Sequence, residues 1–204
     1  MPDAFVDYTP AQDASLWGWN SSSPVLTQFI NAETKIIIEV GSWLGKSSIH
    51  MGSFAKNKKI DFVLICIDTW LGSWDHWRDN QSTLKLSHGY PRMYFDFLSN
   101  IKNSGLEDYV IPIPLPSTVG AAFLKNLAPE LRADIIYVDG SHETQDVYCD
   151  LVNFWPLVKP EGILIADDYP MDCVRLGIQH FVTNYKLENL LAVQGEKCFF
   201  RKPV

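Results

Sequence analysis

Paired cysteines and a surplus of basic residues are both missing from this sequence, and each absence excludes a class of protein. The 204-residue chain has four cysteines, none of which forms a Cys-x-x-Cys pair. We therefore expect neither a disulfide framework nor a zinc site, and interpret the cysteines as small buried hydrophobes. The formal net charge is −7 at pH 7. Binding to nucleic acid through phosphates requires dense lysine and arginine, so no nucleic-acid partner is expected.

Long apolar runs are missing as well. No window approaches the ~18 uninterrupted apolar residues of a transmembrane helix, and the N-terminus has no basic and apolar regions like those of a secretory signal. These features predict a cytoplasmic protein without a membrane partner. A hydrophobic content of 47% is enough for the core of one domain spanning residues 1–204.

Short apolar runs rich in β-branched residues alternate with amphipathic segments along the chain. The alternation predicts an α/β fold with a mainly parallel sheet, and continuous apolar character fits strands covered on both faces. The first helix is expected at 47–54, and a C-terminal hairpin is expected from strands at 187–193 and 197–202. The five preceding strands are expected at 35–40, 61–68, 109–115, 133–139 and 162–167.

The first predicted strand leads into a glycine loop that favours a particular kind of ligand. Glu39 ends the apolar run, and Gly41 and Gly45 follow with three residues between them. A strand, glycine loop and helix start present backbone N–H groups to a ligand. The phosphate-binding Walker loop has four residues between its glycines, and the dinucleotide pattern Gly-x-Gly-x-x-Gly is absent. Because Glu39 would repel a phosphate and attract an ammonium group, the loop favours a cofactor with a cationic amino-acid end.

Acidic residues also end the other central strands. In an open parallel sheet, ligands bind beyond the carboxyl ends of the strands. Crowded carboxylates raise one another's pKa values unless cations or hydrogen-bond donors engage them. Asp68, at the second strand end, is suited to paired hydrogen bonds with ribose hydroxyls. The acids expected at this one edge are Glu39, Asp68, Asp139, Asp167 and Asp168.

Four motifs end the central strands of the predicted sheet. They are Ile-Ile-Ile-Glu39-Val-Gly41-x-x-x-Gly45, Cys-Ile-Asp68-Thr-Trp, Tyr-Val-Asp139-Gly-Ser-His142 and Ile-Ala-Asp167-Asp168-Tyr169. Together they resemble the class I S-adenosylmethionine-dependent methyltransferases. The resemblance is greatest to small-molecule O-methyltransferases related to macrocin O-methyltransferase and the cephalosporin hydroxylase-like group. It implies a Rossmann-like, doubly wound, seven-stranded and mostly parallel sheet with an antiparallel C-terminal strand.

The resemblance also implies which residues bind S-adenosylmethionine. Glu39, Gly41 and Gly45 would surround the methionine part, Asp68 would bind the ribose and Ser117 would contact the adenine. The remaining cofactor-binding residues assigned to this site are Ser42, Ser47, Thr69 and Asp139.

The same resemblance implies a metal site. Aspartates at the positions of Asp139, Asp167 and Asp168 hold Mg²⁺ in metal-dependent relatives, and hard oxygen ligands from adjacent strand ends suit that ion. Such an ion would lower the pKa of a substrate hydroxyl and orient it. A structural alternative stays open, in which Asp167 caps a helix and Asp139 accepts hydrogen bonds from backbone amides.

His142 is the candidate general base, and with Asp139 it forms the predicted catalytic pair. It follows Asp139 in the same loop, and its unperturbed pKa of ~6.5 suits proton removal near neutrality. Some relatives carry a second acid two residues after the first aspartate. This chain has Ser141 there, which leaves the identity of the base open.

Two further segments lie outside the regular pattern. Residues 1–23 are expected to form an N-terminal extension or lid, and residues 70–91 an insertion over the active site. Trp70, Trp74 and Trp77 in the second segment fit either an aromatic wall over the acceptor or a hydrophobic patch that fills a homodimer contact or extra core. His76 and His88 in the same segment are interpreted as structural or rim residues.

The sequence thus predicts an S-adenosylmethionine-dependent O-methyltransferase that acts on a hydroxyl of a small molecule with the help of Mg²⁺. Three alternatives remain. The first is a metal-independent methyltransferase whose acidic cluster is structural. The second is a P-loop-like nucleotide-binding protein, and the third is a degenerate fold that binds the cofactor without turnover.

Overall fold

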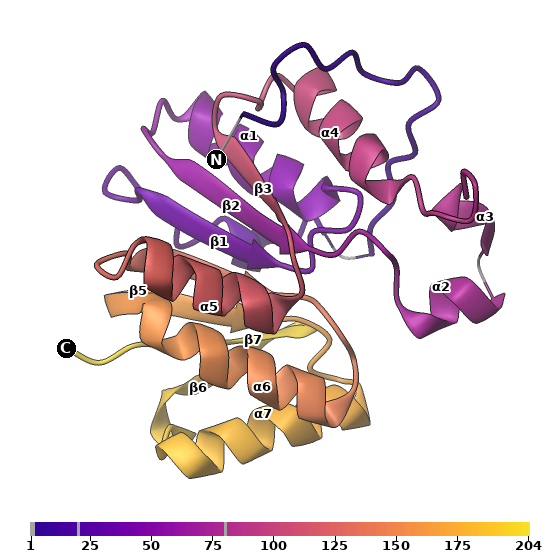
Figure 1. The fold of residues 1–204 in the computed structure, drawn as a ribbon. Helices are drawn as coiled ribbons and strands as arrows, with labels where there is room; N and C mark the ends of the chain where they lie inside the picture. The colour runs from indigo at the N-terminus through magenta and orange to yellow at the C-terminus, as the bar shows by residue number, and fades with distance from the viewer. Residues whose placement is uncertain (1–2, 20, 80) are drawn as a thin grey trace.

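A seven-stranded sheet forms the centre of the molecule, with strand order β3-β2-β1-β4-β5-β7-β6 (Figure 1). The computed structural model describes residues 3–19, 21–79 and 81–204. Neighbouring strands from β3 to β5 are parallel, and β7 is antiparallel to both β5 and β6. This topology confirms the predicted fold class. The strands are β1 (Ile36–Val40), β2 (Val63–Asp68), β3 (Val110–Pro114), β4 (Ala133–Val138), β5 (Val158–Ala166), β6 (Leu191–Gln194) and β7 (Lys197–Arg201).

Helices cover both faces of the sheet, as the apolar strands require. Alternate residues of β1 point to opposite faces, so Ile38 belongs to one core and Ile37 to the other. The core around Ile38 includes α5 (Ser117–Leu127), α6 (Thr144–Phe154) and α7 (Asp172–Tyr185). The core around Ile37 includes α1 (Lys46–Asn57) and α4 (Met93–Asn103). The remaining short helices are α2 (Trp74–Asp79), α3 (Gln81–Leu84) and the 3-10 turns Pro24–Leu26, Trp155–Leu157 and Glu188–Leu190.

Several element bounds differ from the sequence prediction. Strand β5 begins at Val158 rather than 162, and the pairing of β4 with β5 shifts register between Ala133 and Ile135. Strand β6 begins at Leu191 rather than 187, because the 3-10 turn precedes it. Helix α5 was not predicted. Its interior Gly120 has low helix propensity, but an added Cβ there would lie 2.7 Å from Ile67 Cγ2, so close packing onto β2 explains the glycine.

The N-terminal segment packs back onto α4. The Tyr8 hydroxyl donates to the Phe95 carbonyl at 2.7 Å, and the Asn100 side chain donates to the Ser15 carbonyl at 2.7 Å. Arg92 forms an ion pair with Asp13 at 2.7 Å. Residues 1–2 and 20 of the expected lid, and residue 80 of the expected insertion, lie outside the described residues. None of the described helices is both long and apolar enough to cross a membrane.

Candidate active site

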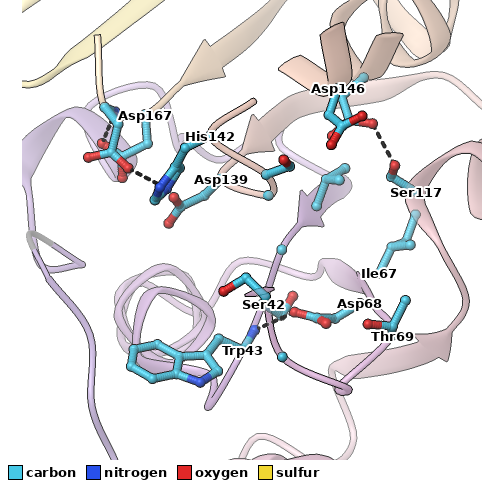
Figure 2. Close-up of a pocket in the computed structure, with 18 of the residues that line it drawn as sticks. Ser42, Trp43, Ile67, Asp68, Thr69, Ser117, Asp139, His142, Asp146 and Asp167 are labelled. Carbon is cyan, nitrogen blue, oxygen red and sulfur yellow. Dashed lines mark hydrogen bonds and ion pairs between the residues drawn. The ribbon is translucent and has the colours of Figure 1, made fainter. Parts of the chain in front are cut away.

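A cavity of about 610 Å³ lies beyond the carboxyl ends of β1, β2 and β4. The strand order reverses at this point, because β1 pairs with β2 on one side and with β4 on the other, and such a reversal is where doubly wound sheets bind ligands. Figure 2 shows residues from the loops after β1 and β2 on one side of the cavity and residues from the loops after β4 and β5 on the other. The sequence-predicted residues that line it are Gly41, Ser42, Ser47, Asp68, Thr69, Ser117, Asp139, His142, Asp167 and Asp168.

Glu39 occupies a different place from the one expected. It is fully buried beneath the loop and does not line the cavity. Its two carboxylate oxygens accept hydrogen bonds from the hydroxyls of Ser47 and Ser48. Burial raises the pKa of Glu39, and these hydrogen bonds oppose the shift. Glu39 therefore ties the first turn of α1 to the end of β1, and both of its oxygens are engaged by protein hydroxyls.

A different structural feature explains why each of the two loop positions is a glycine. Gly41 has φ +85°, and an added Cβ would lie 2.5 Å from the carbonyl carbon of Asp139. The loops meet here through backbone bonds, from Gly41 N–H to the Ile67 carbonyl at 2.9 Å and from Asp139 N–H to the Val40 carbonyl at 2.8 Å. Gly45 caps α1 in the left-handed conformation and does not line the cavity. Both glycines shape the loop.

Asp68 connects the first two loops. Its Oδ2 accepts the Trp43 backbone N–H at 2.8 Å (Figure 2). Its Oδ1 accepts the Trp70 backbone N–H at 2.7 Å. Burial raises the pKa of Asp68, while the backbone hydrogen bonds lower it. Each carboxylate oxygen has two lone pairs. Both oxygens can therefore accept a second hydrogen bond from a bound ligand.

Tyr137, which sequence reasoning missed, joins the carboxylates of β4 and β5. Its hydroxyl hydrogen-bonds to Asp139 Oδ2 at 2.8 Å and to Asp167 Oδ2. Burial and the neighbouring charge of Asp167 raise the pKa of Asp139 well above its usual range. Tyr137 follows two isoleucines in the mainly apolar run of β4, so its sequence context indicated only a core residue. Its role is visible only in the structure, where the ends of β4 and β5 bring Asp139 and Asp167 to the same Tyr137 hydroxyl.

Lys197 is the second residue that sequence reasoning missed. Its ammonium pairs with Asp167 Oδ2, and both side chains are buried. Asp167 Oδ1 accepts the Asp168 backbone N–H at 2.8 Å. Asp167 is thus held by protein groups, and it does not cap α7, whose N-cap residue is Met171. The antiparallel register places Cys198 opposite Ala166, which brings the start of β7 to the end of β5. The sequence feature that could have identified Lys197 was a lysine at the first position of an apolar strand, directly after a turn.

His142 and Asp168 form an ion pair at the cavity. Nε2 of His142 lies 2.9 Å from Asp168 Oδ2. This carboxylate raises the pKa of His142 and has its own pKa lowered in return. Asp168 adopts φ +52°, a left-handed conformation that is uncommon outside glycine and clusters at functional sites. Among the described residues, Asp139, His142 and Asp168 offer ligand atoms within 4.8 Å of one another, a spacing that fits one metal ion.

A third missed residue, Asp150, lines the opposite end of the cavity. It is buried on α6, and its Oδ1 accepts the hydroxyl hydrogen of Ser117 at 2.5 Å. Burial raises the pKa of Asp150 to about 6. The apolar positions of α6 predicted only a helix that packs on the core. One carboxylate in that helix did not indicate a site residue, because its direction depends on how the helix is oriented.

Asp150 is expected to make stability depend on pH. The folded chain binds its proton more tightly than the unfolded chain does, with a pKa of about 6 against 3.8, so this stabilisation is full below pH 3.8 and disappears as the pH rises through 6. We expect Asp150→Asn to raise the free energy of unfolding by about 1–3 kcal/mol at pH 8, and by less at pH 4.5. Urea unfolding at both pH values, with the exposed Asp108→Asn as control, measures this. Equal effects at the two pH values would contradict it.

Aromatic side chains form the mouth of the cavity. Trp17, Trp19, Trp43 and Trp74 line it. The rings of Trp19 and Trp43 stack with centroids 5.2 Å apart and an interplanar angle of 3°. Trp70, by contrast, is buried in the core at 1% exposure. Of the three tryptophans in this segment, Trp74 lines the cavity, as an aromatic wall would, and Trp70 belongs to the core.

Comparison with known proteins identifies the family. Residues 38–169 match the family model described as a methyltransferase domain, and the chain belongs to this family. It is a class I S-adenosylmethionine-dependent methyltransferase, as the motifs indicated. No curated protein sequence matches the chain.

Solved structures share the fold. The O-methyltransferase NovP has 19% identity and a TM-score of 0.62, over 85% of this chain and 74% of that chain. CalS11, a TDP-rhamnose 3'-O-methyltransferase of calicheamicin biosynthesis, has 13% identity and a TM-score of 0.64, over 87% and 76%. An O-methyltransferase from Bacillus cereus in complex with SAH has 14% identity and a TM-score of 0.60, over 93% and 84%.

Proposed function

We propose that this methyltransferase transfers the methyl group of S-adenosylmethionine to a hydroxyl oxygen of a small molecule. The observation that carries the proposal is one cavity shared by the glycine loop, Asp68 and the His142–Asp168 pair. A methyl donor and a residue able to take up a hydroxyl proton can therefore meet in one space. The O-methyltransferase activity named for NovP, CalS11 and the Bacillus cereus protein supports the choice of oxygen as acceptor atom.

The cofactor extends across the cavity from the β1 loop to α5. Its methionine part lies against Gly41, Ser42 and Ser47, which line the cavity at the start of α1. Its ribose hydroxyls bind Asp68, whose oxygens retain acceptor positions, next to Thr69. Its adenine lies near Ser117, whose hydroxyl is held by Asp150. Glu39 and Gly45 act beneath this surface, by fixing the loop rather than by touching the cofactor.

His142 acts as the general base, and Asp168 orients it. With Nε2 donating to Asp168, Nδ1 is the acceptor nitrogen of the neutral ring. The acceptor hydroxyl gives its proton to this nitrogen, and its oxygen forms the new O–C bond as the C–S bond of the sulfonium breaks. The products are a methyl ether, S-adenosylhomocysteine and protonated His142. Holding the reactants in line supplies most of the acceleration, because orientation replaces a bimolecular encounter.

The acceptor is a small hydroxylated molecule held under the aromatic mouth. Trp17, Trp19 and Trp74 give large apolar surfaces near His142 in the same cavity, as small-molecule sites generally do. In this proposal, the N-terminal segment that carries Trp17 and Trp19, and the insertion that carries Trp74, serve as the two covers of the active site.

A divalent cation such as Mg²⁺ assists the reaction in the leading form of this proposal. Asp139 and Asp168 would hold it, since their oxygens lie together and suit hard cations. Once bound, it would lower the pKa of the acceptor hydroxyl. Asp167 fits this role less well than the resemblance implies, because Lys197 and the Asp168 N–H engage its oxygens. These protein partners favour the metal-independent methyltransferase as the second candidate.

Removing divalent ions separates the two forms. We expect EDTA to lower kcat by at least ~10-fold and added Mg²⁺ to restore it, because a cation stabilises the developing alkoxide. Methyl transfer from labelled cofactor measures the effect, and zinc-saturated EDTA is the control for effects of EDTA other than removal of the metal. Turnover that survives exhaustive chelation would reject the metal and favour the second candidate.

Asp68→Ala tests the cofactor assignment. We expect the variant to bind S-adenosylhomocysteine ~10–100-fold more weakly, because the charge-assisted hydrogen bonds to two ribose hydroxyls are lost. Isothermal titration measures the affinity, and circular dichroism checks the fold. Asp61→Ala is the matched control, since Asp61 precedes the same strand and its side chain is 96% exposed. Wild-type protein that binds ATP and not S-adenosylhomocysteine would instead favour the nucleotide-binding alternative.

A further inference from the structure

The carboxylates of Asp139, Asp167 and Asp168, here called the carboxylate cluster, already have a positively charged side chain beside them. Lys197 is the one lysine or arginine that is fully buried among the described residues, with 1% of its surface exposed. Its ammonium pairs with Asp167, and it lies 3.3 Å from the Tyr137 hydroxyl and 5.2 Å from the centroid of the Tyr137 ring. Figure 1 shows that β7, which carries Lys197, lies beside β5.

The position of Lys197 is fixed by the fold. Strand β7 pairs with β5 on one side and β6 on the other, and Lys197 pairs with Gln194 at the start of that hairpin. A buried ammonium requires a partner, because leaving it unpaired away from water is costly. Asp167 is that partner. Lys197 therefore cannot withdraw to solvent when another cation approaches, as an exposed lysine could.

A metal ion and an ammonium group compete for the same carboxylate. Asp167 Oδ2 faces Lys197 and Tyr137, and Asp167 Oδ1 accepts the Asp168 backbone N–H. Lys197 also donates to the Tyr137 oxygen, and the single hydroxyl hydrogen of Tyr137 is shared between the carboxylates of Asp139 and Asp167. The buried lysine thus fixes Asp167 directly and reaches Asp139 through one intervening hydroxyl.

We propose that Lys197 serves as the built-in cation of the carboxylate cluster, holding Asp167 out of the metal-binding set and setting how tightly Asp139 and Asp168 bind a divalent ion. Lys197 is a positioning residue, since it acts through Asp167 and Tyr137. The inference deepens the proposed function and concerns the same site. It implies that a divalent ion gains Asp167 as a ligand only when Lys197 is absent.

Manganese titration of the full chain without cofactor tests this inference. We expect Lys197→Met to bind Mn²⁺ at least ~10-fold more tightly than wild type, because one repelling charge is lost and one carboxylate is gained. Its melting temperature should also rise on addition of Mn²⁺ by more than that of wild type. A residue with only a structural role would not strengthen metal binding when it is removed.

The neutral pair Lys197→Met/Asp167→Asn is the matched control. It removes both charges together, and we expect its Mn²⁺ affinity to stay within about threefold of wild type, since the ligands Asp139 and Asp168 remain. The inference would be equally supported if the Lys197→Met variant binds Mn²⁺ while the wild type and the double variant do not.

Three results would overturn it. The first is an unchanged or weaker Mn²⁺ affinity of Lys197→Met, and the second is a Lys197→Met chain that stays unfolded even with Mn²⁺. The third is a double variant that loses the metal binding of wild type, since Asp167 would then be a ligand despite Lys197. Failure of the proposed function is seen separately, as absence of S-adenosylhomocysteine binding, which this cofactor-free titration does not require.

Discussion

Gly41→Ala is expected to lower the free energy of unfolding by about 2–5 kcal/mol, from left-handed strain and overpacking together. The new Cβ would lie 2.5 Å from the Asp139 carbonyl carbon at φ +85°. Relief would require the loops after β1 and β4 to separate, and the backbone hydrogen bond from Asp139 N–H to the Val40 carbonyl holds them together. Because the same loops form the proposed cofactor surface, S-adenosylhomocysteine binding should disappear as well. Urea unfolding and isothermal titration measure the two effects.

Gly195→Ala is the matched control for Gly41→Ala. Gly195 also has a positive φ, +64°, but an added Cβ would meet nothing within 4 Å. Its substitution should cost only the conformational strain, about 1–2 kcal/mol, and leave cofactor binding unchanged. Equal losses of stability in the two variants would show that the contact with the Asp139 backbone is not the cause.

His142→Asn is expected to lower kcat by ~10²–10⁴-fold, the usual contribution of a positioned general base. The affinity for S-adenosylhomocysteine should change little, because His142 lies across the cavity from Asp68 (Figure 2). Single-turnover methyl transfer with saturating cofactor measures the chemical step. His142→Ala, which leaves room in a half-exposed position, should regain part of its activity when imidazole is added.

Substitution of two other histidines tests whether a loss of activity is specific to His142. His180→Asn alters an exposed residue of α7 and should leave kcat unchanged. His76 also lines the cavity, where its Nδ1 lies 2.6 Å from the Ser73 hydroxyl. Loss of activity in His76→Asn together with full activity in His142→Asn would move the general base to the insertion and contradict the assignment of His142.

The order of elements and the location of the site could be read from local sequence. Continuous apolar runs predicted β1 to β5 within a few residues, since a strand buried on both faces must be apolar throughout. Acids at the strand ends pointed to one edge of the sheet because parallel strands place their carboxyl ends together. Asp68, Asp139 and Asp168 were found in this way, and His142 was found in the loop after Asp139. All four line the same cavity.

Pairings between distant strands and helices could not be read locally. Asp150 gave no signal, since its burial depends on how α6 packs beside Ser117. Glu39 was correctly placed at the end of β1, but only the structure shows that Ser47 and Ser48 occupy its oxygens. A sequence reports which carboxylates are present, whereas the partner of each depends on side-chain directions across the whole sheet.

The sequence by itself determined the methyltransferase fold and the edge of the sheet where chemistry takes place, because both follow from apolar periodicity and from residues next to each other in the chain. Only the tertiary structure decided how the charges at that edge are balanced. Asp167 and Lys197 are 30 residues apart, and the antiparallel register of β7 alone brings them into contact. An ion pair formed across strands depends on register, and register is specified where the strand buries its apolar face against the rest of the fold.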